Sequence, residues 1–281
     1  MIQEEIESKM VVKRLQKNKL IINKIDDKKL DDIIHEHSVL LFELYKTNKL
    51  FYKTVFKAHR FNLAALILTI SFEDESSFSE VMRRFMPLNL MSKNSVSNFF
   101  NMLVFTGRIK TTRNINDTRK INFHLTEKLK KETYLLITTM TQPLSINLNF
   151  GNLVCGSDAF LRSFFYGFSR LVINNLFFFD SVPHANIFIN RDGGHAIILC
   201  LFCEKVKITD NRYLSIKVND MTNKCGVSRS HILKILDDMK AVGFIAGDIS
   251  NNRLILTGEF CDFARDYFRL YFSFCMMGMI D

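Results

Sequence analysis

The fold is decided by residues 225–236, which read Cys225-Gly226-Val227-Ser228-Arg229-Ser230-His231-Ile232-Leu233-Lys234-Ile235-Leu236. A serine at a helix start can accept a hydrogen bond from an unpaired backbone N–H of the first turn. A glycine beyond the last apolar position can adopt the left-handed conformation that caps a helix end. Ser228 and Gly243 stand at these two positions. The sequence therefore predicts a helix that begins after Ser228 and ends near Gly243.

The same helix-start serine and helix-end glycine occur 136 residues earlier, where Ser92 corresponds to Ser228 and Gly107 to Gly243. In both segments the apolar residues have the i, i+3, i+4, i+7 spacing of one helical face. They are Val96, Phe99, Phe100 and Leu103 in the first segment, and Ile232, Ile235, Leu236 and Met239 in the second. Because a shared period is stronger evidence than shared letters, we expect two copies of one unit.

A β-hairpin is predicted after each glycine. Each copy continues with a short apolar strand, a turn rich in Asn, Asp or Ser, and a second strand that ends in a Leu-Thr pair; these polar residues bond their own backbone and favour turns. The expected strands cover residues 109–113 and 118–125 in the first copy and residues 244–249 and 253–256 in the second.

A further helix is expected before each serine. In the first copy, Ser77-Phe78-Ser79-Glu80 is a capping-box pattern. In the second copy, residues 215–217 predict a short strand and residues 219–224 a short helix, with Gly226 in the turn that follows. Helix, turn, helix and hairpin in this order define the winged helix-turn-helix. The stretch quoted above resembles the recognition-helix pattern of bacterial winged-helix regulators of the MarR (multiple-antibiotic-resistance regulator) type.

The resemblance covers both copies, although Leu90 and Met91 of the first copy stand where the second has Gly226 and Val227. It implies a transcription regulator that binds double-stranded DNA through the second helix of each unit. Members of the family pair two chains through their terminal helices. For this chain the resemblance therefore implies either a monomer with an internal pseudo-dimer or a homodimer.

The expected fold class is mainly α with small β-hairpins (α+β), as two winged helix-turn-helix domains in tandem, joined and flanked by helices that form a pseudo-two-fold core. The expected ranges are 1–50 for an N-terminal helical arm, 51–145 for the first domain, 146–190 for a helical linker, and 191–281 for the second domain with a C-terminal helix. A chain of 281 residues with 47% apolar content is consistent with two domains.

The charge of the chain favours a polyanionic partner, because the formal net charge is +9. Segment 92–131 contains nine basic side chains against Asp117 and Glu127, whereas segment 228–270 contains six of each sign. The nine are Lys93, Arg108, Lys110, Arg113, Arg119, Lys120, Lys128, Lys130 and Lys131. Since phosphate neutralisation supplies most non-specific affinity for DNA, we expect the first copy to bind DNA more strongly.

The candidate DNA-binding residues fall into three groups, which reflect hydrogen bonding to bases in the major groove and charge pairing with phosphates. Those of the first recognition helix are Asn94, Ser95, Ser97, Asn98 and Asn101. Those of the second recognition helix are Arg229, Ser230, His231 and Lys234. Residues expected at phosphates or in the wings are Lys93, Lys110, Arg113, Arg119, Lys120 and Arg253.

No motif for catalysis, a cofactor or a metal is evident, so we do not expect an enzyme. The six cysteines include a CxxC pair, Cys200 and Cys203, inside an apolar helical stretch, and we expect them to be reduced and buried. With no signal peptide and no apolar run long enough for a membrane span, a cytoplasmic protein is expected.

The sequence is also compatible with two other functions. The units could form a protein-interaction scaffold that does not touch DNA, or the chain could be a plasmid replication initiator. A small-molecule effector is also open, since family members often have a ligand cleft beside the pairing helices. The aromatic region 160–179, with Phe260, Tyr267 and Tyr271, is the candidate lining.

Overall fold

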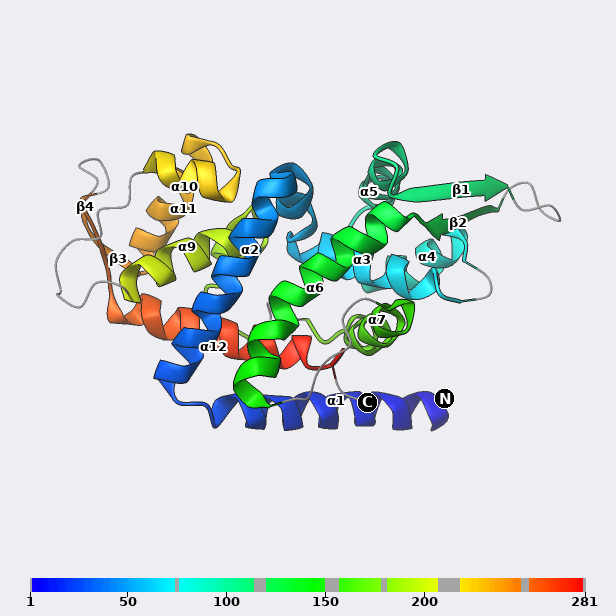
Figure 1. The fold of residues 1–281 in the computed structure, drawn as a ribbon, viewed down its shortest axis with the longest axis horizontal. Helices are drawn as coiled ribbons and strands as arrows, with labels where there is room; N and C mark the ends of the chain where they lie inside the picture. Colours follow the sequence, from blue (N-terminus) through cyan, green and yellow to red (C-terminus); the bar gives the residue numbers. More distant parts are fainter. Residues whose placement is uncertain are drawn as a thin grey trace.

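The computed structural model describes residues 2–73, 76–113, 120–149, 157–177, 181–206, 218–248 and 253–279. These residues are mostly helical, with two small antiparallel hairpins (Figure 1). The expected α+β class is therefore confirmed. The predicted turns at 114–117 and 250–252 and the predicted strand at 215–217 lie outside the described residues.

The first unit begins at a helix that follows residue 57 and ends in a long helix after the hairpin. Its elements are α3 (Ala58–Ile70), α4 (Phe78–Phe85), the 3-10 turn η1 (Met86–Leu88), α5 (Lys93–Phe105), β1 (Ile109–Arg113), β2 (Ile121–Leu125) and α6 (Glu127–Leu148). Ser77 and Ser92 cap α4 and α5 as predicted. A bridge between Ser77 and Asn122 adds a short third segment to the hairpin.

The second unit repeats this order of elements. It consists of α9 (Gly194–Val206), α10 (Val218–Cys225), α11 (Arg229–Ala241), β3 (Ile245–Asp248), β4 (Arg253–Leu256) and α12 (Gly258–Cys275). Helices α3 and α9 lie 136 residues apart and have the same length, and so do α5 and α11. Ser228 caps α11. The predicted helix bounds are thus confirmed in both copies.

The two units also share their local hydrogen bonds where helix, hairpin and last helix meet. Thr126 Oγ1 accepts from the first turn of α6 and donates to the carbonyl of Gly107, at 2.9 Å. Thr257 Oγ1 makes the same two contacts with α12 and with the carbonyl of Gly243, also at 2.9 Å. Both glycines have positive φ, 69° and 80°, where a side chain would be strained. The repeat is therefore present in the structure as well as in the sequence.

The helix that precedes each unit in the sequence packs on the other unit. Helix α2 (Asp27–Val55) packs on α9 of the second unit and on α6, whereas α7 (Asp158–Ile173) packs on α3 of the first unit. The short helix α8 (Asn186–Ile189) leads into α9. Each unit is consequently supported by a helix that belongs to the other half of the chain.

Helix α1 (Ile2–Asn23) runs along α12 on the side opposite α5 and α10 (Figure 1). Residues 24–26 separate α1 from α2, and Asp26 caps α2. Arg265 of α12 makes a bidentate ion pair with Asp31 of α2, at 2.8 and 2.9 Å. The expected boundary between residues 50 and 51 falls inside α2, just beyond a kink at Asn48.

Candidate nucleic-acid interface

Helix α5 turns its polar residues outward. Val96, Phe99, Phe100 and Leu103 are buried against the rest of the unit. The polar residues on the opposite side are exposed, except Ser97, which is half-buried; the exposed ones are Lys93, Asn94, Ser95, Asn98 and Asn101. No acidic side chain lies within α5. This face therefore offers amide and hydroxyl groups without a negative charge to repel phosphate.

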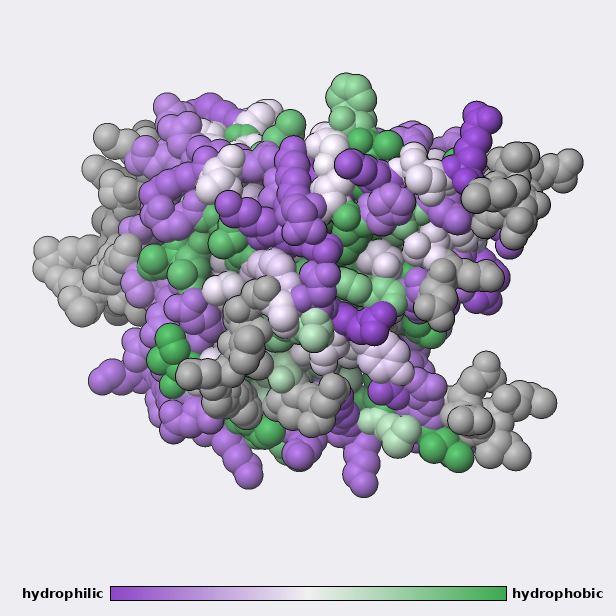
Figure 2. Space-filling model, turned by 45° about the vertical axis from the view of Figure 1, so that its right-hand side comes forward, coloured by the Kyte–Doolittle hydropathy of each residue, from purple (hydrophilic) through white to green (hydrophobic). Residues whose placement is uncertain are grey.

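The hairpin beside α5 carries the second group of predicted residues. Lys110 and Arg113 are exposed on β1, and Lys120 is exposed just before β2. Arg119 lies outside the described residues. In the register of the hairpin, Lys110 is opposite His124 and Arg113 is opposite Ile121. The described cations therefore extend the polar face of α5 along the hairpin. Hydrophilic side chains cover much of the upper surface of the molecule (Figure 2).

Arg108 is not part of this basic surface, so the prediction that all nine cations form it is wrong. Its side chain is 3% exposed and makes a bidentate ion pair with Glu132 of α6, with both N···O distances 2.7 Å. The guanidinium also lies 3.7 Å from the ring centroid of Phe51. Lys130 is also paired, with Asp158 at 2.7 Å. Arg108 is thus withdrawn from solvent, and Lys130, which is 21% exposed, links α6 to Asp158.

The polar face of α11 is more constrained. Arg229, Ser230 and Lys234 are exposed, whereas His231 is half-buried and its Nε2 contacts the carbonyl of Asp192 at 3.0 Å. The side chain of Arg253, which begins β4, lies outside the described residues. Asp237 is exposed on the same helix. Helix α11 thus offers fewer free hydrogen-bonding groups than α5 and an acidic one among them.

The turns that position α5 and α11 differ. In the second unit Gly226 provides the left-handed residue, with φ 69°, whereas in the first unit Asn89 does so with φ 55°. Asn89 follows the 3-10 turn η1, which explains how Pro87 is accommodated before α5. Asparagine tolerates left-handed φ better than most residues, and this was the signal that could have located the first turn.

A buried hydrogen-bonded chain joins the two halves beneath these helices. His37 Nδ1 lies 2.6 Å from the Thr139 carbonyl, and its Nε2 lies 3.0 Å from His195 Nε2. His195 Nδ1 lies 2.9 Å from the Tyr267 hydroxyl. Because a carbonyl only accepts, His37 must donate from Nδ1, and as a neutral imidazole it accepts at Nε2. A neutral His195 then donates to His37 and accepts from Tyr267, which is an arrangement that both uncharged imidazoles can make.

Burial lowers the pKa of His37 to about 4 and holds the pKa of His195 well below its usual range. The same cause raises the pKa of Tyr267, so its hydroxyl stays protonated and able to donate. The four residues come from α2, α6, α9 and α12. Both histidines are therefore held as uncharged imidazoles where the network joins the two halves of the chain.

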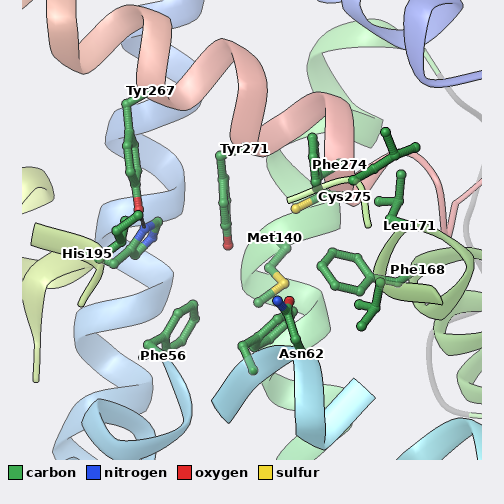
Figure 3. A pocket seen from close by; sticks show the side chains of 14 residues that line it. Phe56, Asn62, Met140, Phe168, Leu171, His195, Tyr267, Tyr271, Phe274 and Cys275 are labelled. Atoms are coloured by element: carbon green, nitrogen blue, oxygen red, sulfur yellow. Dashed lines mark hydrogen bonds between the residues drawn. The ribbon is translucent and has the colours of Figure 1, made fainter. Parts of the chain in front are cut away.

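An apolar cavity of ≈ 80 Å³ adjoins this network. Phe168, Leu171, Val172 and Leu176 of the predicted aromatic region line it, as do Tyr267 and Tyr271 of α12. Phe260 does not line it and packs instead on Phe244 and Phe263. Figure 3 shows Met140, Asn62 and Tyr271 directed toward a common space, with Tyr267 against His195. Part of the predicted region therefore lines the cavity together with Tyr267 and Tyr271, whereas Phe260 does not.

Four of the cysteines are buried, Cys200, Cys203, Cys225 and Cys275, whereas Cys261 is half-buried. The predicted burial of the CxxC pair in α9 is confirmed. No helix in the described ranges is long and apolar enough to cross a membrane. No family model, curated protein or solved structure matches the chain.

Proposed function

We propose that the two units are winged-helix domains and that the chain is a sequence-selective, double-stranded DNA-binding regulator of transcription. The observation that carries this proposal is the outer face of α5, where exposed Asn94, Asn98 and Asn101 stand beside the cationic hairpin. Asparagine can bond adenine through two hydrogen bonds in the major groove, and that groove distinguishes all four base pairs. The repeated helix, helix and hairpin order supports the same reading for the second unit.

In this proposal α5 enters the major groove, and Lys110, Arg113 and Lys120 contact phosphates. Two such helices in one rigid chain read sites about one helical turn apart, roughly 34 Å. Because α11 differs from α5 at every outward position of the repeat, the two sites differ in sequence. The chain thus acts as a pseudo-dimer on an asymmetric operator.

Selection from a randomised duplex pool tests the proposal, followed by anisotropy measurements on the selected sequence. We expect enrichment of one asymmetric sequence. Asn98→Ala and Asn101→Ala should each lower discrimination at one base pair by about 1–3 kcal/mol. Unchanged binding after Lys110, Arg113, Arg119 and Lys120 are all replaced by Ala would favour the scaffold function, and selection of direct repeats would favour a replication initiator.

The cavity beside His195 supports a small apolar effector as a second proposal. Cavities lined by apolar side chains stay dry and can bind small aromatic molecules. Indole and toluene should raise the Tm of the intact chain and change its affinity for the selected duplex. In Leu171→Phe, where a larger side chain fills the cavity, neither compound should have an effect. Equal shifts in both proteins would place binding elsewhere.

A further inference from the structure

Four cations surround the junction between α2 and α3, and we call them the central corner: Lys49, Lys53, Lys57 and Arg60. Figure 1 shows the end of α2 between α10 on one side and α5 on the other. None of these residues belongs to a recognition helix or a hairpin. These four cations therefore lie between the two units, outside the elements already assigned to DNA.

On one side the central corner contacts the turn that leads into α11. Lys53 Nζ donates to the carbonyl of Gly226 at 2.7 Å. A β-carbon at Gly226 would lie 3.2 Å from the Cβ of Lys49, so the two backbones approach closely. Lys53 thereby also places its charge at the C-terminal end of α10, where a cation is favourable. These contacts fix the corner against the second unit.

On the other side the central corner shares a surface hollow of ≈ 350 Å³ with the recognition helix of the first unit. Lys57 and Arg60 form one wall of this hollow, and Ser95 and Asn98 of α5 form another. The corner and the base-facing side of α5 are consequently one continuous surface. Cations therefore run from the turn before α11 to the outer face of α5.

One acidic residue lies among these cations. Asp192 Oδ1 is 3.5 Å from Lys57 Nζ and 3.9 Å from Arg60 Nη1, and within the described residues this oxygen accepts no hydrogen bond. The side chains of Lys57 and Arg60 remain 35% and 33% exposed. Ion pairs of this length and exposure are weak. The donors of both cations therefore remain available to a stronger, more closely placed anion.

The shape of a duplex supplies such an anion at this position. When two helices occupy successive major grooves on one side of the DNA, the intervening minor groove and its two phosphate backbones face the protein between them. We propose that the central corner is a third DNA-binding element, in which Lys57 and Arg60 hold backbone phosphates between the two recognition sites and phosphate displaces Asp192. This inference rests on the proposed function. It adds a phosphate contact that positions the protein on the duplex and does not distinguish base pairs.

The test compares Lys57→Gln/Arg60→Gln with a control, Lys13→Gln/Lys17→Gln, which removes two exposed charges from α1 on the opposite side. Affinity is measured by anisotropy across a KCl series, on a duplex of about 30 base pairs that spans both sites and on one of about 12 that covers a single site. Circular dichroism and thermal melting establish that both variants are folded.

We expect the corner variant to bind the long duplex about tenfold more weakly, with the salt slope reduced by about 2, since each lost phosphate contact removes roughly 0.9. On the short duplex it should match the intact chain, and the control should match it on both. Asp192→Asn should bind the long duplex more tightly. Its backbone carbonyl, which contacts His231, is unaffected by this change.

Unchanged affinity and salt slope of the folded corner variant on the long duplex would overturn the inference while leaving the proposed function intact. An equal loss on both duplexes would also overturn it, because the contact would not then lie between the sites. Weaker binding by Asp192→Asn would contradict displacement by phosphate. If the intact chain binds no duplex, the proposed function fails and the inference fails with it.

Discussion

His37 and His195, which are 158 positions apart in the chain, face each other through their Nε2 atoms at 3.0 Å. This bond needs at least one neutral imidazole, because a doubly protonated pair would place two donors and two positive charges together. The contact lies at the meeting of α2 and α9, where the two halves of the chain exchange helices. The stability of that meeting point should therefore depend on pH.

Stability should fall as the solution becomes acidic. The folded pKa of His37 is about 4 and its ordinary value is 6.5, so the unfolded chain binds more protons between these values. The stabilisation is complete above about pH 6.5 and is lost as the pH drops toward 4. Urea unfolding at steps between pH 7.5 and 5 measures it.

His37→Asn is the matched variant for this measurement. Its amide can still donate to the Thr139 carbonyl but no longer accepts from His195. We expect a loss of roughly 1–3 kcal/mol at pH 7.5, because a buried N–H is left without a partner. The pH dependence should be shallower than that of the intact chain. A variant with an equally steep profile would show that other groups cause the acid sensitivity.

Arg108 and Glu132 should matter for stability and not for DNA contact. Glu132→Gln leaves a guanidinium that is 3% exposed without its counter-charge. We expect a loss of about 3 kcal/mol in the free energy of unfolding. Lys131→Met, at an exposed site on the same helix, should change it little. Urea titration measures both, and a negligible effect of Glu132→Gln would contradict a structural role for the pair.

The two units should contribute unequally to DNA affinity. Lys110→Gln/Arg113→Gln removes two exposed charges from the first unit, and Arg229→Gln/Lys234→Gln removes two from the second. We expect the first pair to weaken binding more, because α11 carries exposed Asp237 near its cations. Anisotropy at fixed salt compares them. A larger loss of affinity from the second pair of substitutions would show that the second unit contributes more to DNA binding than the first.

The cysteines should differ in reactivity toward iodoacetamide. Burial raises the pKa of Cys275, and the hydrogen bond that the Cys225 thiol makes to Cys200, together with burial, raises the pKa of Cys225. Because the thiolate is the reactive form, these thiols should label only after unfolding, whereas half-buried Cys261 labels first among the described cysteines. Peptide mass mapping reads each site separately. Rapid native labelling of Cys225 would contradict this packing.

The sequence predicts local elements of this fold well because their signals are local. Ser92, Ser228, Gly107 and Gly243 mark helix ends through the bonds of one turn, and the structure has them at those ends. Arg108 was assigned to the surface because a count over neighbouring residues cannot reveal Phe51 or Glu132. The repeat did contain a signal, since Arg108 aligns with Phe244, which is buried.

Contacts between distant segments could not be predicted in this way. The bond between His37 and His195 depends on α2 reaching the other unit, and no periodicity within α2 specifies that destination. The central corner was missed for the same reason, since Lys57 and Arg60 become neighbours of α5 only through the packing of α3. The outward residues of α5 were predicted because helical spacing alone determines them.

The exchanged helices α2 and α7 give the chain the character of a domain-swapped dimer whose two subunits have been fused end to end. A cut in the connection between α6 and α7 would yield two fragments, of which the first supplies α2 to cover α9 and the second supplies α7 to cover α3. Neither fragment could bury the apolar residues of α3 or α9 in this way alone. The protein is thus a natural candidate for fragment complementation, in which structure returns only when both pieces share a solution.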